Sequence, residues 1–267
     1  MSTKTKAWLN LALYFLTIGV NALGAFGVIN GMSQREVSDK YPTLITPSPF
    51  TFSIWSVIYL LLLAALLWMA LRSEEPHAAR LIERISVPFW SVSALNILWI
   101  VAFSYELVGL STLFILALVV CLAWLVLRIP RPEVFMERVN SLGFGLYTGW
   151  LVIATVVNVA AFLVQIGWDG FGIAAATWAV IILVVSFAVA MLILLRLQHA
   201  AVPVPLAWAY FGIWQAHRAG GAFNNQYPTI GIVALVLAGA YLAVAVYKFV
   251  RNDMCSLPRS RAANAAG

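Results

Sequence analysis

The chain has 267 residues, of which 63% are hydrophobic and only 10% are charged, with a mean hydropathy of +0.94. Soluble proteins carry about 25% charged residues, so this composition excludes a soluble globule and makes the lipid bilayer the solvent for much of the apolar surface. The net charge of +6 does not indicate nucleic-acid binding, because the basic residues lie between apolar runs instead of forming one patch.

Eight apolar segments follow one another and predict an all-α, polytopic transmembrane helix bundle. A helix needs about 20 residues to cross ~30 Å of hydrocarbon, and seven segments approach or exceed that length: Trp8–Ile29, Phe52–Leu71, Ile85–Ser104, Leu110–Leu127, Leu142–Leu163, Ile173–Leu195 and Ile230–Phe249. The first is longer than the ~7–15 apolar residues of a signal peptide, so we expect a retained helix.

The eighth segment, Val202–Gln215, is shorter and contains Pro203 and Pro205. Proline costs little in the first helical turn, because its missing N–H would have no partner there. The distribution of basic residues decides whether this segment crosses. If it did not, the four basic residues of the C-terminal region would lie on the outer side, against the positive-inside rule.

With eight crossings, basic residues concentrate on one side of the membrane. The inner side then holds thirteen of them: Lys4, Lys6, Arg72, Arg80, Arg84, Arg128, Arg131, Arg138, Arg196, Lys248, Arg251, Arg259 and Arg261. The outer side holds three: Arg35, Lys40 and Arg218. This asymmetry predicts an integral protein of a bacterial inner (cell) membrane with both termini cytoplasmic.

The longest predicted outer loop, Asn30–Thr51, contains Pro42, Pro47 and Pro49. Prolines fix φ and restrict the residues that precede them. We therefore expect this loop to be ordered and to lie over the bundle as a lid.

The usual groups of catalytic and metal chemistry do not appear within the spans. Glu106 and Asp169 fall in short outer turns, and His77, His199 and His217 fall at loops or helix ends. Intramembrane charges mark ion pathways, and zinc or haem ligation requires clustered donors. We therefore expect no enzyme activity, no catalytic residue, no metal site and no ion-coupled pump, and the two cysteines do not predict a disulfide framework.

Aromatic and amide side chains form a stripe on each of three predicted helices. The spacing places them on one face of each helix; they are Trp55 and Tyr59, then Asn96, Trp99 and Phe103, then Tyr147, Trp150, Ala154 and Asn158. At ~1.5 Å per residue, most lie roughly 5–15 Å below the outer surface, with Trp150 near the middle. The stripes predict one amphipathic cavity in the outer half of the bundle, beneath the lid.

Ordinary membrane packing is the alternative for many of these residues. Tryptophan is enriched at both membrane interfaces, and we assign six to such belts: Trp8, Trp68, Trp90, Trp124, Trp168 and Trp178. An asparagine in a span can hydrogen-bond a neighbouring helix, which we expect of Asn21, with a contribution of about 0.6–2 kcal/mol.

Two further patterns predict structure and no site. Gly145 and Gly149 form a GxxxG pair, which permits close helix contact. Gln215, His217 and Arg218 form an unusual polar cluster at the outer end of the short seventh span, and we expect a solvated helix end there.

Three segments that contain the stripes resemble the translocator family, also called TspO/MBR or tryptophan-rich sensory proteins. Residues 47–59 (PSPFTFSIWSVIY) resemble the family's proline-rich loop leading into F-x-x-W-x-x-x-Y. Residues 95–103 (LNILWIVAF) resemble its L-N-x-x-W-x-x-x-F helix, and residues 147–158 (YTGWLVIATVVN) resemble its Y-x-x-W-x-x-x-A-x-x-x-N helix. The resemblance covers about Trp8 to Leu163.

The resemblance implies a five-helix bundle that binds porphyrins, and in some cases sterols, in a cavity beneath the first loop, with roles in tetrapyrrole handling, stress responses and regulation. It implies that the nine stripe residues line or brace that cavity, and that porphyrin or haem is a ligand and no cofactor is required. Aromatic faces and amides suit a flat tetrapyrrole. A loose sterol-recognition pattern ending at Arg251 is weak, and we assign no sterol binding from it.

The chain departs from the family core by its three additional spans. We therefore predict residues 1–165 as a TspO-like membrane core, residues 166–250 as three additional transmembrane helices, and residues 251–267 as a basic cytoplasmic tail. The preferred interpretation is a non-enzymatic protein that binds a hydrophobic small molecule with a sensory or regulatory output, and a homodimer is an open option. A transporter of amphipathic small molecules is the alternative, and an enzyme that degrades its porphyrin is the least supported.

Overall fold

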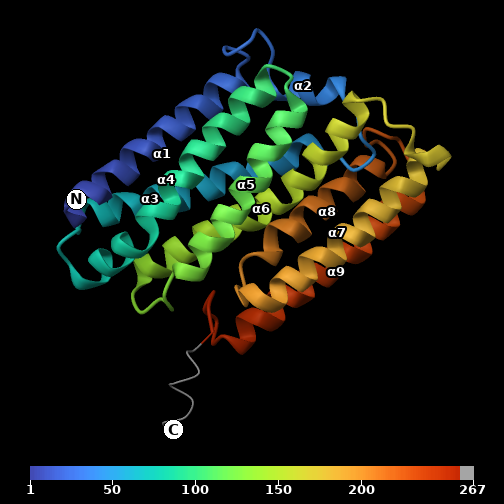
Figure 1. The fold of residues 1–267 in the computed structure, drawn as a ribbon. Coiled ribbons are helices and arrows are strands. Elements are labelled where there is room, and N and C mark those ends of the chain that lie inside the picture. Colours follow the sequence, from blue (N-terminus) through green and yellow to red (C-terminus); the bar gives the residue numbers. More distant parts are fainter. Residues whose placement is uncertain (259–267) are drawn as a thin grey trace.

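The computed structural model describes residues 1–258, and these residues form nine α-helices and two 3₁₀-helices without any strand (Figure 1). The elements are α1 (Thr3–Ala25), α2 (Gln34–Lys40), η1 (Pro49–Ser53), α3 (Ile54–Leu71), α4 (Pro76–Ser104), α5 (Val108–Arg128), α6 (Phe135–Gln165), η2 (Gly170–Gly172), α7 (Ala175–Leu197), α8 (Pro203–His217) and α9 (Pro228–Arg251). Each predicted span overlaps one helix, so the predicted helical membrane bundle is confirmed, although α4 and α6 begin nine and seven residues before the predicted starts.

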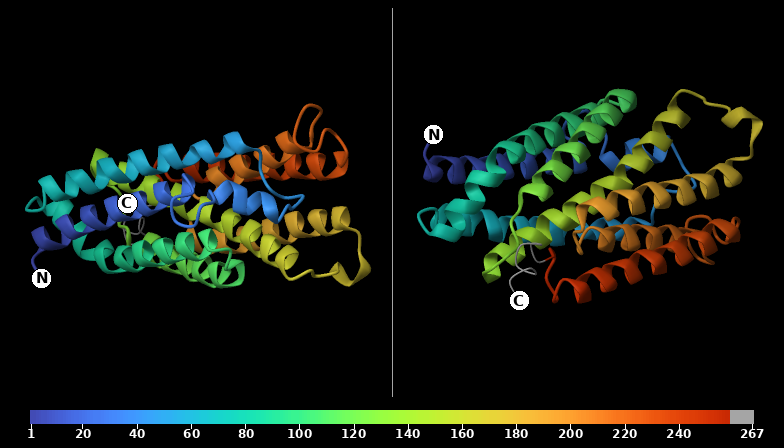
Figure 2. Two further views of the ribbon diagram at one scale, coloured as in Figure 1. Left: turned by 90° about the horizontal axis from the view of Figure 1, so that it is seen from above. Right: turned by 60° about the horizontal axis from the view of Figure 1, so that its bottom comes forward.

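Seven helices are long and apolar enough to cross a membrane, and α8, with 15 residues, is the exception among the eight predicted spans. The helices run along one elongated bundle, with the N-terminus and the end of α9 towards the same end (Figure 2). We call this the tail end, and we call the opposite end, which holds residues 26–53 and the turns before α5, α7 and α9, the loop end. Which end faces the cytoplasm stays a prediction, and Arg259 and Arg261 lie outside the described residues.

Five helices close into a ring. The order is α1, α3, α6, α5 and α4, and each helix packs against the next, with α4 also contacting α1. Side chains that point inwards are almost fully buried, among them Ile58, Phe89, Ile115 and Phe144. The stripes predicted on α3, α4 and α6 therefore lie on helices of a single ring.

Helix α8 is largely buried, with one face of half-buried side chains. It packs against α6, α9 and η1, and none of its 15 residues is exposed. A helix of that length spans only about 22 Å, but lipid does not surround it, so its backbone ends meet protein groups instead of hydrocarbon. By contrast, α7 and α9 expose apolar side chains such as Leu192 and Val236, which are 64% and 65% exposed.

The GxxxG pair joins the first five helices to the last three. A Cβ added at Gly145 would lie 2.3 Å from Cε1 of His199, and one added at Gly149 would lie 2.0 Å from the carbonyl oxygen of Val202. The packing role predicted for both glycines is confirmed, and their partner is the segment that leads into α8. The last three helices and the ring therefore share one continuous interior.

The beginning of the C-terminal region also packs into this interior. Ser256 Oγ lies 2.6 Å from Ser141 Oγ of α6, and the Ser256 carbonyl accepts a hydrogen bond from the Ala200 N–H at 2.8 Å. Cys255 is 5% exposed. Residues 252–256 therefore form part of the folded tail end, in the region where the sequence predicted a basic tail.

Candidate ligand site

Asn96 links three helices of the ring through its side-chain amide. Its Nδ2 donates to the hydroxyl of Tyr147 on α6 at 2.8 Å, and its Oδ1 accepts from Nδ2 of Asn21 on α1 at 2.6 Å. The Asn96 side chain is 1% exposed. The interhelical hydrogen bond predicted for Asn21 is confirmed, and its partner is one of the predicted site residues.

Asn158 forms a second such junction nearer the loop end. Its Oδ1 accepts from Nε1 of Trp99 at 3.0 Å, while its Nδ2 donates to Thr112 Oγ1 at 2.7 Å and to Ser111 Oγ at 3.1 Å. The junction connects α4, α5 and α6. Ser111 and Thr112 were not among the predicted residues, although two adjacent hydroxyls inside an otherwise apolar span are a signal that the sequence contains.

The aromatic members of the stripes contact one another beside these amides. The ring of Trp55 stacks on Tyr59 with centroids 5.0 Å apart and meets the rings of Tyr147 and Trp150 edge-on at 5.7 and 6.3 Å. Phe52, one helical turn earlier, also meets Trp150 edge-on at 5.6 Å. Edge-to-face pairs of this kind are favourable beyond their buried area.

Five of the nine predicted residues belong to one cluster of ring contacts and hydrogen bonds, namely Trp55, Tyr59, Asn96, Tyr147 and Trp150. Trp99 and Asn158 form the separate junction with α5 described above. The other two, Phe103 and Ala154, are half-buried on the same helices. The space left between α1, α3, α4 and α6 is a cavity of about 20 Å³, bordered by Tyr59, Phe89 and Tyr147. This volume suits about one water molecule, so a tetrapyrrole enters only if these side chains separate, and a ligand-binding role stays a prediction.

The predicted lid first attaches to the five-helix ring. Lys40 Nζ lies 2.8 Å from Oε1 of Glu106, in the turn between α4 and α5, and the Tyr41 hydroxyl donates to Oε2 at 3.1 Å. Gln165, at the end of α6, donates to the same hydroxyl at 3.1 Å. The hydrogen bond from Lys40 holds the pKa of the Glu106 carboxyl below its usual value, so the charged attachment persists at neutral pH.

The same loop then attaches to α8. The Ser48 N–H donates to the Gly212 carbonyl at 3.0 Å, and Trp208 Nε1 donates to the Thr51 carbonyl at 2.8 Å. A Cβ at Gly212 would lie 2.3 Å from Thr51 Oγ1, so only glycine permits this approach. The lid therefore connects the ring to α8, which the sequence did not predict.

His217 corrects one expectation from the sequence. The polar cluster at the end of α8 was predicted to be a solvated helix end, but His217 is 1% exposed, and its Nε2–H donates to the Leu44 carbonyl at 2.8 Å. Its ring also stacks on Phe223 with centroids 4.4 Å apart. The lid and the α8–α9 turn cover it, and only the neighbouring Arg218 is exposed.

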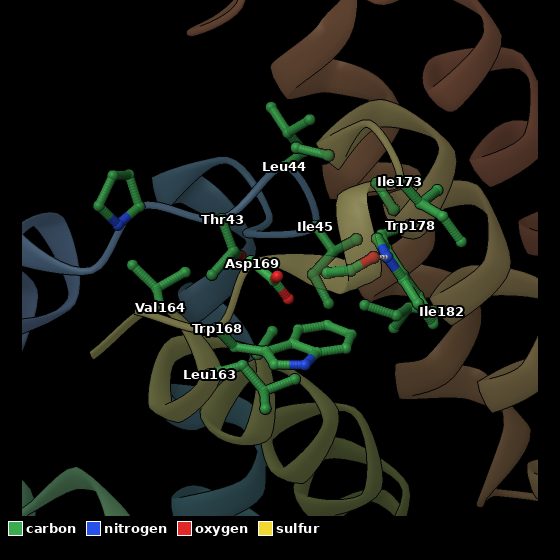
Figure 3. Close-up of a pocket in the computed structure, with 15 residues that line it drawn as sticks. Thr43, Leu44, Ile45, Leu163, Val164, Trp168, Asp169, Ile173, Trp178 and Ile182 are labelled. Carbon is green, nitrogen blue, oxygen red and sulfur yellow. Dashed lines mark hydrogen bonds between the residues drawn. The ribbon is translucent and has the colours of Figure 1, made fainter. Parts of the chain in front are cut away.

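A larger cavity of about 280 Å³ lies outside the ring, at the loop end (Figure 3). It is bounded by lid residues 42–45, the end of α6 and the start of α7, and none of the nine predicted residues lines it. Trp168 and Trp178, which the sequence assigned to the interfacial belt, form part of its wall. The sequence missed this cavity because it is made by segments more than 100 residues apart.

The chemistry available in the ring is hydrogen bonding and aromatic contact. Within residues 1–258, no three His, Cys, Asp or Glu side chains lie close enough together to hold a metal ion. Cys121 and Cys255 are free thiols.

These features define a polytopic helical membrane protein with an aromatic and amide cluster inside a five-helix ring. A model of the family described as TSPO-like protein matches residues 7–247, and the chain therefore belongs to the TSPO-like family. The matched region extends past the five-helix ring through α7 and α8 and into α9. The family is generally non-enzymatic. Comparison with curated proteins and with solved structures gave no match.

Proposed function

We propose that this TSPO-like membrane protein binds a flat, hydrophobic ligand of the tetrapyrrole class within its five-helix ring, and that binding has a sensory or regulatory role without catalysis. The observation that carries the proposal is the Asn96 junction, where a buried amide joins Asn21 and Tyr147 beside stacked aromatic rings. Buried amides offer both a donor and an acceptor to a ligand edge, and aromatic faces suit a planar macrocycle.

A ligand in this position must replace contacts that the protein makes with itself. Trp55 is half-buried at the start of α3 and packs edge-on against Tyr147 and Trp150, so its displacement opens the ring towards the lid. Insertion next to Asn96 then exchanges the bond to Tyr147 for a bond to the ligand. Because the α4–α6 contact differs between the two states, ligand binding shifts the balance between them, which is the physical requirement for a signal.

Titration with protoporphyrin tests the proposal. The purified protein in detergent is titrated while its tryptophan fluorescence is followed, and we expect saturable quenching. In a double variant, Trp99→Ala with Trp150→Ala, we expect the apparent binding affinity to be at least about tenfold weaker. Trp124→Phe is the matched control. Trp124 is 39% exposed on α5 and contacts Arg128 with its ring, so it does not contribute to the proposed site. Unsaturable quenching, or equal affinity in the double variant and the wild type, would reject the ring site.

Transport of amphipathic molecules is the second candidate, and α8 is the observation that favours it. This helix is short, begins at Pro203 with Pro205 in its first turn, is largely buried against α6 and α9, and accepts a hydrogen bond from the lid. Interrupted or half-length helices are found at the substrate sites of transporters. Proteoliposomes loaded with the wild-type protein are expected to accumulate protoporphyrin if this is correct, and binding without flux rejects transport.

A further inference from the structure

The 280 Å³ cavity at the loop end has a nearly apolar wall. Its floor is the end of α6, with Ala160 and Leu163, its roof is the lid at Ile45, and its far side is α7, with Ile182. The volume is close to the lower limit of small-molecule pockets, about 300 Å³. An apolar chain fits such a space, and α7 continues from it with lipid-exposed side chains such as Val185, which is 53% exposed.

Asp169 supplies the one charged group of this cavity wall. Its Oδ1 accepts from the Phe171 N–H at 2.9 Å, which fixes the side chain. Asp169 is exposed, so this carboxylate lies at the open mouth of the cavity, and Figure 3 shows it on the cavity side of the turn beside Trp168. No lysine, arginine or histidine is among the described residues that line the cavity. The carboxylate therefore gives the site a negative charge that its own wall does not neutralise.

Two indole rings complete the charged end of the cavity. The rings of Trp168 and Trp178 lie 4.9 Å apart, and Trp178 Nε1 donates to the Gly170 carbonyl at 2.7 Å. Gly170 has φ +64°, and a Cβ there would lie 2.8 Å from Trp178 Nε1, so the turn that carries Asp169 is seated tightly on α7. The carboxylate and the indoles are thus held together by the α6–α7 turn.

The carboxylate of Asp169 and the indole rings of Trp168 and Trp178 together favour binding of a cationic group. Indole faces attract ammonium groups, by about 0.5–2 kcal/mol, and a carboxylate adds an opposite charge, while an anionic group would be repelled. We propose that this cavity is a second binding site, which takes an amphiphile with an ammonium head, the head lying between Asp169 and the Trp168–Trp178 pair and the alkyl chain lying along α7. The ammonium head belongs either to a membrane lipid such as phosphatidylethanolamine or to a free amphiphile.

This site is independent of the proposed ring site, since the two share no residue. The ligands also differ in charge, because a protoporphyrin carries carboxylates that Asp169 would repel. Failure of one proposal therefore leaves the other intact.

Binding of a brominated alkylammonium tests the second site. The probe, 11-bromoundecyltrimethylammonium, is titrated into the protein in dodecyl maltoside, and its bromine quenches nearby tryptophans. We expect saturable quenching in the wild type, at least about tenfold weaker affinity in Asp169→Asn, and no saturable quenching by the matched 11-bromoundecyl sulfate. Asn keeps a side-chain oxygen for the Phe171 N–H, so the turn is retained while the charge is lost.

Two control variants separate the cavity from general surface effects. Asp39→Asn removes an equal charge at the loop end from an exposed carboxylate near Arg35, and its affinity is expected to match the wild type. Ala175→Phe adds a bulky side chain to the cavity wall without a charge change, and it is expected to weaken binding. Unchanged affinity in Asp169→Asn, or equal binding of the sulfate probe, overturns the proposal.

Quenching measurements in lipid nanodiscs distinguish a membrane lipid from a free amphiphile as the molecule that carries the ammonium group. Phosphatidylethanolamine with brominated acyl chains is compared with brominated phosphatidylglycerol, in wild type and Asp169→Asn. Stronger quenching by phosphatidylethanolamine that disappears in Asp169→Asn supports a lipid ligand. Binding of the alkylammonium probe without any lipid preference supports a free amphiphile.

Discussion

Gly149 of α6 lies directly against the backbone of Val202, the residue before α8, so that a Cβ at position 149 would fall 2.0 Å from the Val202 carbonyl oxygen. Gly145, one turn earlier, faces His199 in the same way. The helix that carries Tyr147 and Trp150 towards the ring thus presents its opposite face to α8. The backbones of α6 and of the segment leading into α8 are therefore in direct contact.

Substitution of Gly149 is expected to destabilise the whole protein. In Gly149→Ala, the Cβ overlaps a backbone atom that has no rotamer to adopt, so we expect a loss of about 1–3 kcal/mol. Thermal unfolding in detergent measures it. Gly239→Ala on α9 is the control, because nothing lies within 4 Å of its added Cβ, and that variant is expected to be neutral or slightly more stable. Equal melting temperatures in the two variants would contradict the close contact.

The hydrogen bond between Asn96 and Tyr147 is expected to couple the two residues energetically. Interhelical hydrogen bonds in membrane proteins contribute about 0.6–2 kcal/mol. The same Asn96 amide also accepts a hydrogen bond from Asn21. A double-mutant cycle of Asn96→Ala and Tyr147→Phe, followed by unfolding in detergent, is expected to give a coupling energy in that range. Strict additivity of the two single variants would show that the bond contributes nothing.

His199 makes the stability of the tail end depend on pH. It lies between α7 and α8 and is fully buried; burial is the main cause that lowers its pKa from 6.5 to about 4. The Ala201 N–H donates to Nδ1 at 3.3 Å and Ser141 Oγ lies 3.1 Å from Nε2, so the neutral ring with its proton on Nε2 satisfies both contacts. Protonation of Nδ1 breaks the first.

The direction of this pH dependence follows from the two pKa values. Between pH 6.5 and 4 the unfolded chain binds a proton at His199 and the folded chain does not, so stability is fully present above about pH 6.5 and decreases as the pH falls to about 4. We expect a loss of about 2 kcal/mol between pH 7 and pH 5. In His199→Gln this part of the dependence is expected to vanish; a variant that loses stability as steeply as the wild type would refute the assignment.

The lid is expected to loosen when its contact with α8 is removed. His217→Phe keeps the stacking on Phe223 but removes the donor to the Leu44 carbonyl. Hydrogen exchange followed by mass spectrometry is expected to show faster exchange in residues 42–48 and unchanged exchange in α5. Arg35→Ala, on the exposed face of α2, serves as the control. Unaltered exchange in residues 42–48 of His217→Phe would mean that other contacts hold the lid.

The sequence predicted the helices well because membrane insertion leaves few alternatives. In lipid, each backbone N–H and C=O needs a partner within its own segment, so an apolar run of sufficient length can only be helical. The periodic positions of Asn96, Trp99, Tyr147 and Asn158 placed them on facing sides of two helices, and the structure joins Asn96 to Tyr147 and Trp99 to Asn158 across α4 and α6. Whether they bind a ligand remains a prediction, since periodicity records which residues face inwards and not what space they leave.

The sequence did not predict which segments pack around α8. Length made Val202–Gln215 doubtful as a span, and charge suggested that it crosses, but only the fold shows that α6, α9 and the lid bury most of it. Burial of His217 and the contact between Thr51 and Gly212 depend on that placement. Local propensity carries no information on which distant segment will cover a given face.

The sequence by itself therefore determined the membrane as solvent and the approximate positions of eight of the nine α-helices, because hydropathy and helical period act within one segment. It predicted neither the short helix α2 nor the early starts of α4 and α6. The tertiary structure alone decided the ring order, the junction of α6 with α8, and the cavity where Asp169 meets Trp168 and Trp178. These features arise from contacts between segments far apart in the chain, which are fixed by side-chain packing once the helices have assembled.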